Sequence, residues 1–80
     1  MNNEISLVTG ANGHLGNNLV RLLLSKGLKV RATVRNTKNT VPFKNLDCEI
    51  AYADLTKKES LVKAFKGVTN LYEVGGAFKL

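Results

Sequence analysis

The chain has 80 residues, fewer than the about 100–150 of a typical domain, and 44% of them are hydrophobic and 22% charged. No apolar run approaches the about 20 residues that cross a bilayer, and the start of the chain lacks the pattern of a secretory signal, so we predict one small, cytoplasmic globular unit without a membrane partner. The net charge of +6 is spread along the chain without a dense basic run, which argues against nucleic acid as a partner.

The first half of the chain predicts a strand, a helix and a second strand. Residues 4–9 are apolar and β-branched and end abruptly at Gly10, which is typical of a short strand. Between residues 14 and 26 the leucines follow the spacing of one helical face, and Gly27 follows as a C-cap. Residues 29–35 then alternate strictly, as a half-buried strand does. We expect a core-facing set and a solvent-facing set on this strand: Val30, Ala32 and Val34 against Lys29, Arg31, Thr33 and Arg35.

The middle of the chain predicts a loop followed by a third strand. Residues 36–47 are polar and contain the only proline, so we expect a loop with a short helical turn near residues 43–46. Residues 48–53 form the third strand. It begins with Cys48, the only cysteine, which has no disulfide partner in the chain and which we expect to be a small core residue.

The last part of the chain predicts a second helix and a fourth strand. Thr56 and Glu59 have the capping-box spacing, in which each side chain satisfies a free backbone donor, so a helix should run over residues 57–66. Gly67 ends this helix. Residues 70–74 then predict a fourth strand that runs into small residues.

This order of elements predicts an α/β fold with a parallel sheet and crossover helices. Right-handed crossovers favour a partial Rossmann-type sheet of about four strands in the order 3-2-1-4. The switch point then lies between the first and fourth strands, where such sheets bind ligands beyond their carboxyl ends. The fourth strand would be an exposed edge, so we expect marginal stability or self-association.

The glycine-rich loop after the first strand has the position and spacing of a phosphate cradle. Gly10 permits a tight turn, Gly13 lets the backbone approach a pyrophosphate, and Gly16 allows the helix to pack closely. Free N–H groups and the positive end of the helix dipole then face the anion. The alternative is a glycine-rich turn without a ligand. The predicted site in this loop comprises Gly10, Asn12, Gly13, His14, Leu15 and Gly16.

Three segments, TGANGHLGNNLVRLLLSKG, VRATVRN and ADLTKKESLVKAFKGV, together resemble the N-terminal part of the extended short-chain dehydrogenase/reductase superfamily. The pattern is most similar to that of dihydroflavonol-4-reductase-like enzymes and their bacterial relatives. This resemblance implies that residues 1–80 are the front of an NAD(P)-binding Rossmann domain. It implies hydride transfer to or from a small-molecule carbonyl or alcohol in a longer parent, whose substrate and catalytic parts lie outside this chain.

The end of the second strand favours NADP(H) over NAD(H). NAD-preferring Rossmann proteins place a carboxylate there to hold the ribose 2′-hydroxyl, but this chain has Arg35. A guanidinium suits a 2′-phosphate, which a carboxylate would repel. The resemblance implies that Arg35 contacts this phosphate and that Lys44 helps. The alternative is that Arg35 is a solvated charge at the end of a strand.

The resemblance also implies that Asp54 and Leu55, at the end of the third strand, bracket the adenine ring. The competing role for Asp54 is to cap the turn into the second helix. For His14 in the glycine loop we favour a packing role over a phosphate contact.

The end of the fourth strand departs from the resembled pattern. Glu73 stands where the family has a histidine, but Gly75 and Gly76 follow and keep the backbone accessible to a cofactor. The contacts near the nicotinamide end are therefore open.

The catalytic Tyr-x-x-x-Lys pair of the resembled family is absent from this sequence. Tyr52 is followed four residues later by Thr56, and Tyr72 by Gly76, so neither tyrosine has the lysine that would lower its pKa. With one His and one Cys, we expect no metal site. The chain alone is therefore predicted to be inactive, and the alternative to a reductase fragment is a non-catalytic NADP(H)-binding module or redox sensor.

Overall fold

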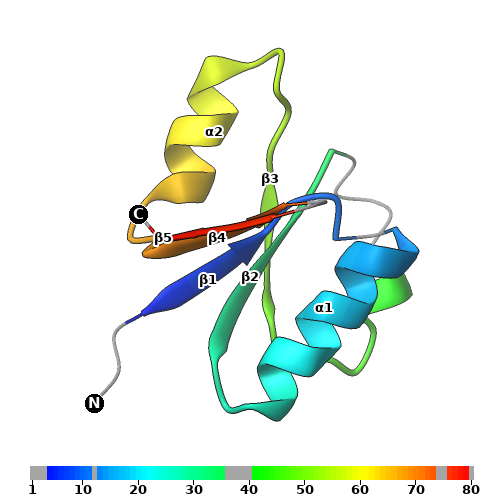
Figure 1. The fold of residues 1–80 in the computed structure, drawn as a ribbon. Helices are drawn as coiled ribbons and strands as arrows, with labels where there is room; N and C mark the ends of the chain where they lie inside the picture. Colours follow the sequence, from blue (N-terminus) through cyan, green and yellow to red (C-terminus); the bar gives the residue numbers. More distant parts are fainter. Residues whose placement is uncertain (1–3, 12, 36–40, 74–75, 80) are drawn as a thin grey trace.

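The computed structural model describes residues 4–11, 13–35, 41–73 and 76–79 (Figure 1). Its elements are β1 (Ile5–Val8), α1 (His14–Ser25), β2 (Lys29–Val34), the 3₁₀ helix η1 (Val41–Phe43), β3 (Glu49–Tyr52), α2 (Lys58–Phe65), β4 (Asn70–Glu73) and β5 (Gly76–Lys79). The strands form one sheet in the order β3-β2-β1-β4-β5, in which the first four are parallel. This confirms the predicted Rossmann-type order of the first four strands.

The two α-helices cover opposite faces of the sheet. In Figure 1, α1 and η1 lie on one face and α2 lies on the other. Helix α1 connects β1 to β2 in one direction across the sheet, whereas α2 connects β3 back to β4 in the other direction. Because both crossovers are right-handed, reversing the direction moves the helix to the opposite face.

The main core lies between α1, η1 and the sheet. Its buried members are Val8, Ala11, Val20, Leu23, Val30, Ala32, Val34 and Phe43. Three of them are the alternate residues of β2 that were predicted to face a core, and they are 2%, 0% and 3% exposed. Hydrophobic burial on this face therefore follows the period-2 pattern of the sequence.

The prediction that the other side of β2 faces water is confirmed for Lys29 and Arg35, which are exposed, but is wrong for Arg31 and Thr33. Thr33 is 4% exposed, and its hydroxyl donates to the Val8 carbonyl at 3.2 Å. The Arg31 side chain is only 12% exposed. Both lie on the side of the sheet that α2 covers, and a parallel sheet is normally covered on both faces. Polar residues there are buried with hydrogen-bond partners.

The helical turn in the loop after β2 is found two residues earlier than predicted. It spans Val41–Phe43, and the Lys44 and Leu46 amides continue it by donating to the Val41 and Phe43 carbonyls at 3.1 and 3.0 Å. The fixed φ of the proline inside it suits the first turn of a helix. Asn45 then ends it with a positive φ of 67°.

The capping box predicted for α2 is not formed. Helix α2 begins at Lys58, and no side chain caps its N-terminus by a hydrogen bond. The Thr56 hydroxyl donates instead to the Asp54 carboxylate at 2.7 Å. Ser60 ties the helix start to this turn, because its hydroxyl oxygen accepts from the Asp54 amide at 2.9 Å and its proton goes to the Lys57 carbonyl at 2.7 Å. Local side-chain bonding by Asp54 has outcompeted the predicted cap.

The fourth strand is not an exposed edge, contrary to prediction. Strand β5 pairs with β4 in antiparallel fashion, from Asn70 opposite Lys79 to Glu73 opposite Gly76. Within the part of the chain that the structure describes, the edges of the sheet are β3 and β5.

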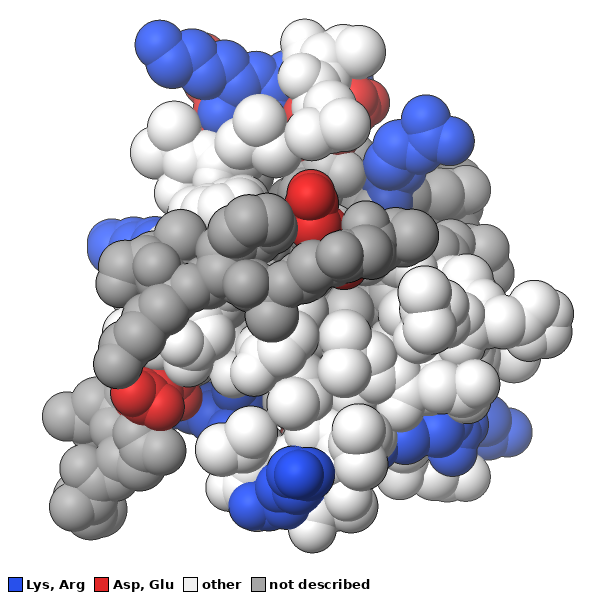
Figure 2. Space-filling view, in the orientation of Figure 1, with Lys and Arg blue, Asp and Glu red and all other residues white. Residues whose placement is uncertain are grey.

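On the face shown in Figure 2, Lys and Arg side chains stand apart, separated by uncharged surface. Over the described ranges, no helix has the length and apolar character that a membrane span requires.

Candidate functional site

A groove of about 900 Å³ opens at the carboxyl ends of the parallel strands, between the sheet and α2. One part of it is polar and is lined by Thr9, Gly10, Thr33, Arg35 and Glu73. The opposite wall is apolar and is formed mainly by residues of α2 and β4, namely Leu61, Val62, Phe65 and Leu71, together with Leu55. The groove lies at the predicted switch point of the sheet, where β1 has β4 on one side and β2 on the other.

The glycine loop has the close packing that its spacing predicts. Gly10 has a φ of +60°, which L side chains rarely adopt. A Cβ on Gly16 would lie 2.3 Å from the Gly10 carbonyl oxygen and 2.9 Å from the Ala11 Cα, so only glycine fits there. A Cβ on Gly13 would lie 3.5 Å from the same oxygen, which is ordinary contact. Gly16 is therefore required by the fold, whereas a side chain at Gly13 would make only ordinary contact within the loop.

The N-terminus of α1 presents uncapped amides next to this loop. The Asn17 amide makes the first helical bond, to the Gly13 carbonyl at 2.8 Å, so the amides of His14, Leu15 and Gly16 have no partner within the helix. No side chain caps this end, and the first turn has no acidic residue. Uncapped amides and a positive dipole end together favour an anion. Asn12, also predicted in this cradle, lies outside the described residues.

His14 and Leu15 are both exposed at the start of α1. Leu15 is 62% exposed, and His14 belongs to the exposed class as well. The packing role favoured for His14 is therefore wrong, because the helix turns this position away from the core.

Arg35 lies on the groove, directly after β2, and its side chain is exposed. Lys44 is not brought to the same place. It is exposed in the turn after η1, a segment that Asn17 ties to α1 by donating to the Pro42 carbonyl at 2.9 Å. Among the described residues, Arg35 is the cation that lines this groove.

Asp54 forms the turn that leads into α2. Its Oδ1 accepts from the Thr56 amide at 2.9 Å and from the Thr56 hydroxyl at 2.7 Å, and its Oδ2 lies 3.5 Å from the Tyr52 hydroxyl. These bonds from Thr56, followed by the charges of Lys57 and Arg35, hold the pKa of the Asp54 carboxyl below its ordinary 3.8. Asp54 thus takes the turn-forming role, while its neighbour Leu55, 87% exposed, projects along the groove.

Because the Asp54 pKa is lower in the folded chain than in the unfolded chain, its contribution to stability is complete above pH 3.8 and is lost as the pH falls through the folded pKa. We expect acid unfolding of the wild type to steepen below about pH 4 for this reason. Asp54→Asn should weaken this steepening. Urea unfolding at pH 6, 4 and 3 measures it, and an identical pH slope in both proteins would contradict the role of Asp54.

The end of β4 carries Glu73 into the groove, as its place in the sequence suggested. Gly76, which was predicted to keep the backbone accessible to a cofactor, pairs with Glu73 as the first residue of β5. Gly75 lies outside the described residues. The sequence analysis did not predict the apolar wall. Val62 belongs to it, a large apolar residue of α2 that is 64% exposed in the structure. No cluster of metal-ligating side chains occurs over the described ranges.

The chain is similar in sequence to parts of longer proteins. The chain is 49% identical over 67 residues to sterol demethylase protein B of Methylococcus capsulatus, covering 84% of the chain and 20% of that protein. It is 41% identical over 76 residues to dihydroflavonol 4-reductase of Zea mays, covering 85% of the chain and 21% of that enzyme. The chain thus spans about a fifth of the length of the curated relatives that it matches.

Solved structures share the fold as well. The Citrobacter sp. triphenylmethane reductase, solved in complex with NADP(H), superposes with a TM-score of 0.74 at 37% identity over 82% of the chain and 24% of that structure. A short-chain dehydrogenase/reductase superfamily protein from Agrobacterium tumefaciens with bound NAD gives 0.72 at 25% identity over 91% of the chain and 20% of that structure. These neighbours and the Zea mays relative confirm the resemblance to the extended short-chain dehydrogenase/reductases. The model of the NmrA-like family matches residues 1–79, and the chain therefore belongs to the NmrA-like family.

Proposed function

We propose that this chain binds NADP(H) in the groove and is the cofactor-binding part of a reductase of the short-chain dehydrogenase/reductase type. The observations that carry the proposal are the uncapped N-terminus of α1 beside the glycine loop and the groove that Arg35 and Gly10, the first glycine of that loop, both line. Such a site offers places for two anionic groups: a pyrophosphate at the N-terminus of α1 and a second phosphate at Arg35. NADP(H) has both.

The glycine loop is the part of the site that would hold the pyrophosphate. The amides of His14, Leu15 and Gly16 are free of helical partners, and Gly13 has no side chain that would keep a phosphate oxygen from reaching them. No carboxylate lies in the first turn of α1 to repel the anion. The residues present therefore fit a dinucleotide.

Arg35 is the group that would hold the 2′-phosphate. Its side chain is exposed and lies on the groove, so the guanidinium is free to make two charge-assisted bonds to a phosphate. Leu55 lines the same groove as Arg35 and offers an apolar surface for the adenine ring. The Oδ1 of Asp54 is engaged by Thr56, which leaves Oδ2 as the oxygen that could accept from the adenine amino group.

Hydride transfer needs groups that this chain does not contain. Bound NADPH supplies the hydride, but the tyrosine and lysine that would supply and steer the proton are absent from the 80 residues. We therefore infer that substrate binding and proton transfer belong to further sequence of a longer protein. A small-molecule ketone or aldehyde is the substrate class that the resemblance to dihydroflavonol 4-reductase suggests.

A non-catalytic NADP(H)-binding module or redox sensor is the second candidate, and the uncapped N-terminus of α1 beside the glycine loop supports it equally. Both candidates require the cofactor, so the sequence of the complete gene distinguishes them. A Tyr-x-x-x-Lys pair within about one further Rossmann domain supports the reductase. A different residue at the tyrosine position supports the sensor.

Binding is tested by calorimetric titration of the chain with NADPH and with NADH at physiological salt. We expect NADPH to bind at least about tenfold more tightly than NADH, since each bond to a charged group contributes about 1.5–3 kcal/mol. A titration with double-stranded DNA serves as the control for the net charge of +6. Binding of DNA without binding of NADPH would overturn the proposal.

A further inference from the structure

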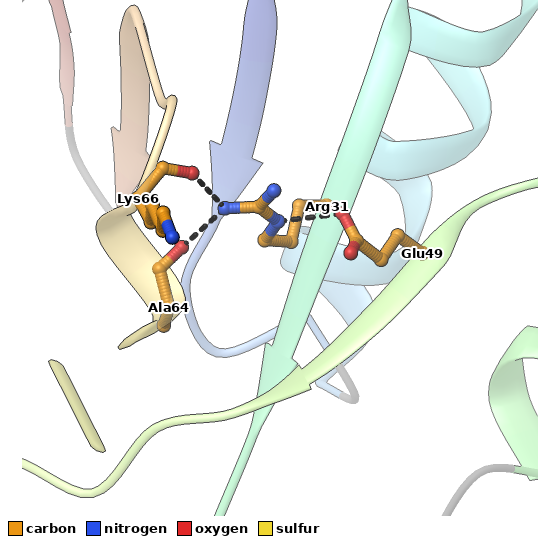
Figure 3. Close-up of polar contacts among 4 residues, drawn as sticks. All are labelled: Arg31, Glu49, Ala64 and Lys66. Atoms are coloured by element: carbon orange, nitrogen blue, oxygen red, sulfur yellow. Dashed lines mark hydrogen bonds and ion pairs between the residues drawn. The ribbon is translucent and has the colours of Figure 1, made fainter. Parts of the chain in front are cut away.

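Arg31 joins three elements of the fold from a nearly buried position. Its Nε donates to Glu49 Oε1 at 2.6 Å, and its Nη1 donates to the carbonyl oxygens of Ala64 and Lys66, each at 2.7 Å (Figure 3). These contacts connect β2 to its neighbour β3 and to the C-terminus of α2. The Arg31 side chain is 12% exposed, whereas that of Glu49 is 57% exposed.

The two carbonyls that Arg31 holds lie on either side of Phe65 in the chain. Phe65 and Leu61, one turn earlier on α2, both line the cofactor groove. The last carbonyls of a helix have no partner within it, and a cation at that end also complements the helix dipole. The Arg31 guanidinium therefore holds the backbone on both sides of Phe65, which is one of the residues that form the apolar wall of the groove.

Helix α2 depends on such ties for its position. It has eight residues, and helices of that length are not stable in water by themselves. At the start of α2, the Ser60 hydroxyl accepts from the Asp54 amide. At its end, Arg31 from the sheet donates to the Ala64 carbonyl. These two ties hold the two ends of α2, and the one at the C-terminal end comes from a residue 33 positions away in the chain.

We propose that Arg31 is a positioning residue for cofactor binding, which acts by holding α2 and its Phe65 against the sheet. The proposal rests on the proposed function of the groove. Loss of the tie lets the C-terminal turn of α2 open, so that the wall is ordered only part of the time. The wall residues Leu61 and Phe65 are apolar and offer no donor to a phosphate, so NADPH and NADH should lose affinity equally. This separates Arg31 from Arg35, whose loss should affect NADPH alone.

The test compares Arg31→Met with Lys29→Met, which makes the same charge change at an exposed position of the same strand. Hydrogen exchange of the amides of residues 62–68 reports on the tie, and titrations with both cofactors report on the groove. For Arg31→Met we expect exchange to be at least about tenfold faster and both affinities to fall by a similar factor, about three- to tenfold. For Lys29→Met we expect wild-type values in both measurements.

Three results would overturn the inference. Faster exchange with unchanged affinities means that Arg31 supports only the fold. A loss confined to NADPH means that Arg31 contacts the 2′-phosphate. Wild-type protein that binds neither cofactor removes the proposed function and this inference together. Circular dichroism checks that Arg31→Met is folded. If it is not, Arg31→Lys takes its place, because it keeps the charge but lacks the planar fork whose Nε and Nη1 reach the carboxylate and the carbonyls separately, and should show the same equal loss to a smaller extent.

Discussion

Arg35→Asp should change the cofactor preference of the chain from NADP(H) towards NAD(H). Arg35 is exposed on the groove, and a guanidinium makes two charge-assisted bonds to a phosphate, each worth about 1.5–3 kcal/mol. Solvent reduces this gain, but even about 1.4 kcal/mol is a tenfold change in affinity. We expect NADPH binding to weaken at least about tenfold and NADH binding to be unchanged or stronger, because the new carboxylate can accept from a ribose hydroxyl.

Calorimetry on both proteins with both cofactors measures this effect. Lys29→Asp is the matched control, since it makes the same charge change at the opposite end of β2 and should leave the ratio of the two affinities unchanged. Equal weakening for both cofactors in Arg35→Asp would show that the arginine supports the fold or the pyrophosphate. Unchanged NADPH affinity would move the assignment to Lys44 or to no side chain.

Gly16→Ala should be the most disruptive single methyl substitution in the glycine loop. The added Cβ would lie 2.3 Å from the Gly10 carbonyl oxygen and 2.9 Å from the Ala11 Cα, and both are backbone atoms that cannot move aside alone. The clash can be relieved only if α1 shifts away from the glycine loop. Overpacking typically costs 1–3 kcal/mol, and a backbone clash should lie at or above the upper end, about 3 kcal/mol. For a chain of this size that is a large part of the free energy of unfolding.

Gly13→Ala is the matched comparison, three residues earlier in the same loop. Its Cβ would meet the Gly10 oxygen at 3.5 Å, and its φ of −80° suits alanine. We expect it to lose no more than about 1 kcal/mol of stability, the usual effect of alanine at an N-cap, but to weaken binding of both cofactors at least about tenfold by filling the space above the loop.

Thermal unfolding and titration together separate the two glycines. Gly16→Ala should lower the melting temperature by more than about 10 °C, whereas Gly13→Ala should lower it by less than about 8 °C and retain a cooperative transition. If both variants melt alike, the close approach at Gly16 does not control packing. If Gly13→Ala binds NADPH as the wild type does, the phosphate does not lie above this loop.

Much of the fold was predictable because its signals are local. The glycine spacing, the leucine stripe of α1 and the alternation of β2 each follow from the geometry of a single element, and handedness rules then order the first four strands. Positive φ values at Gly10 and Gly27, and the tight packing at Gly16, agree with the roles read from the sequence. The position of Arg35 on the groove follows from the end of a strand, which the sequence also marks.

Other features depended on which segments meet in space. Alternation showed that one side of β2 is polar, but only the placement of α2 buries Thr33 and brings Arg31 to the carbonyls at the helix end. The capping-box pattern at Thr56 was overridden by the nearer carboxylate of Asp54. Strand β5 was missed because its pairing with β4 is a tertiary contact that follows two glycines, which read as the end of a strand.

The sequence by itself therefore determined the order of the first four strands, the glycine loop before α1 and the cation at the end of β2. Each of these depends on residues that are close together in the chain, because steric limits and side-chain periodicity act over a few positions. Only the tertiary structure decided what covers the second face of the sheet, and hence the apolar wall of the groove and the tie at Arg31. Those depend on contacts between residues more than thirty positions apart, such as Arg31 with Ala64 and Lys66, which no local pattern encodes.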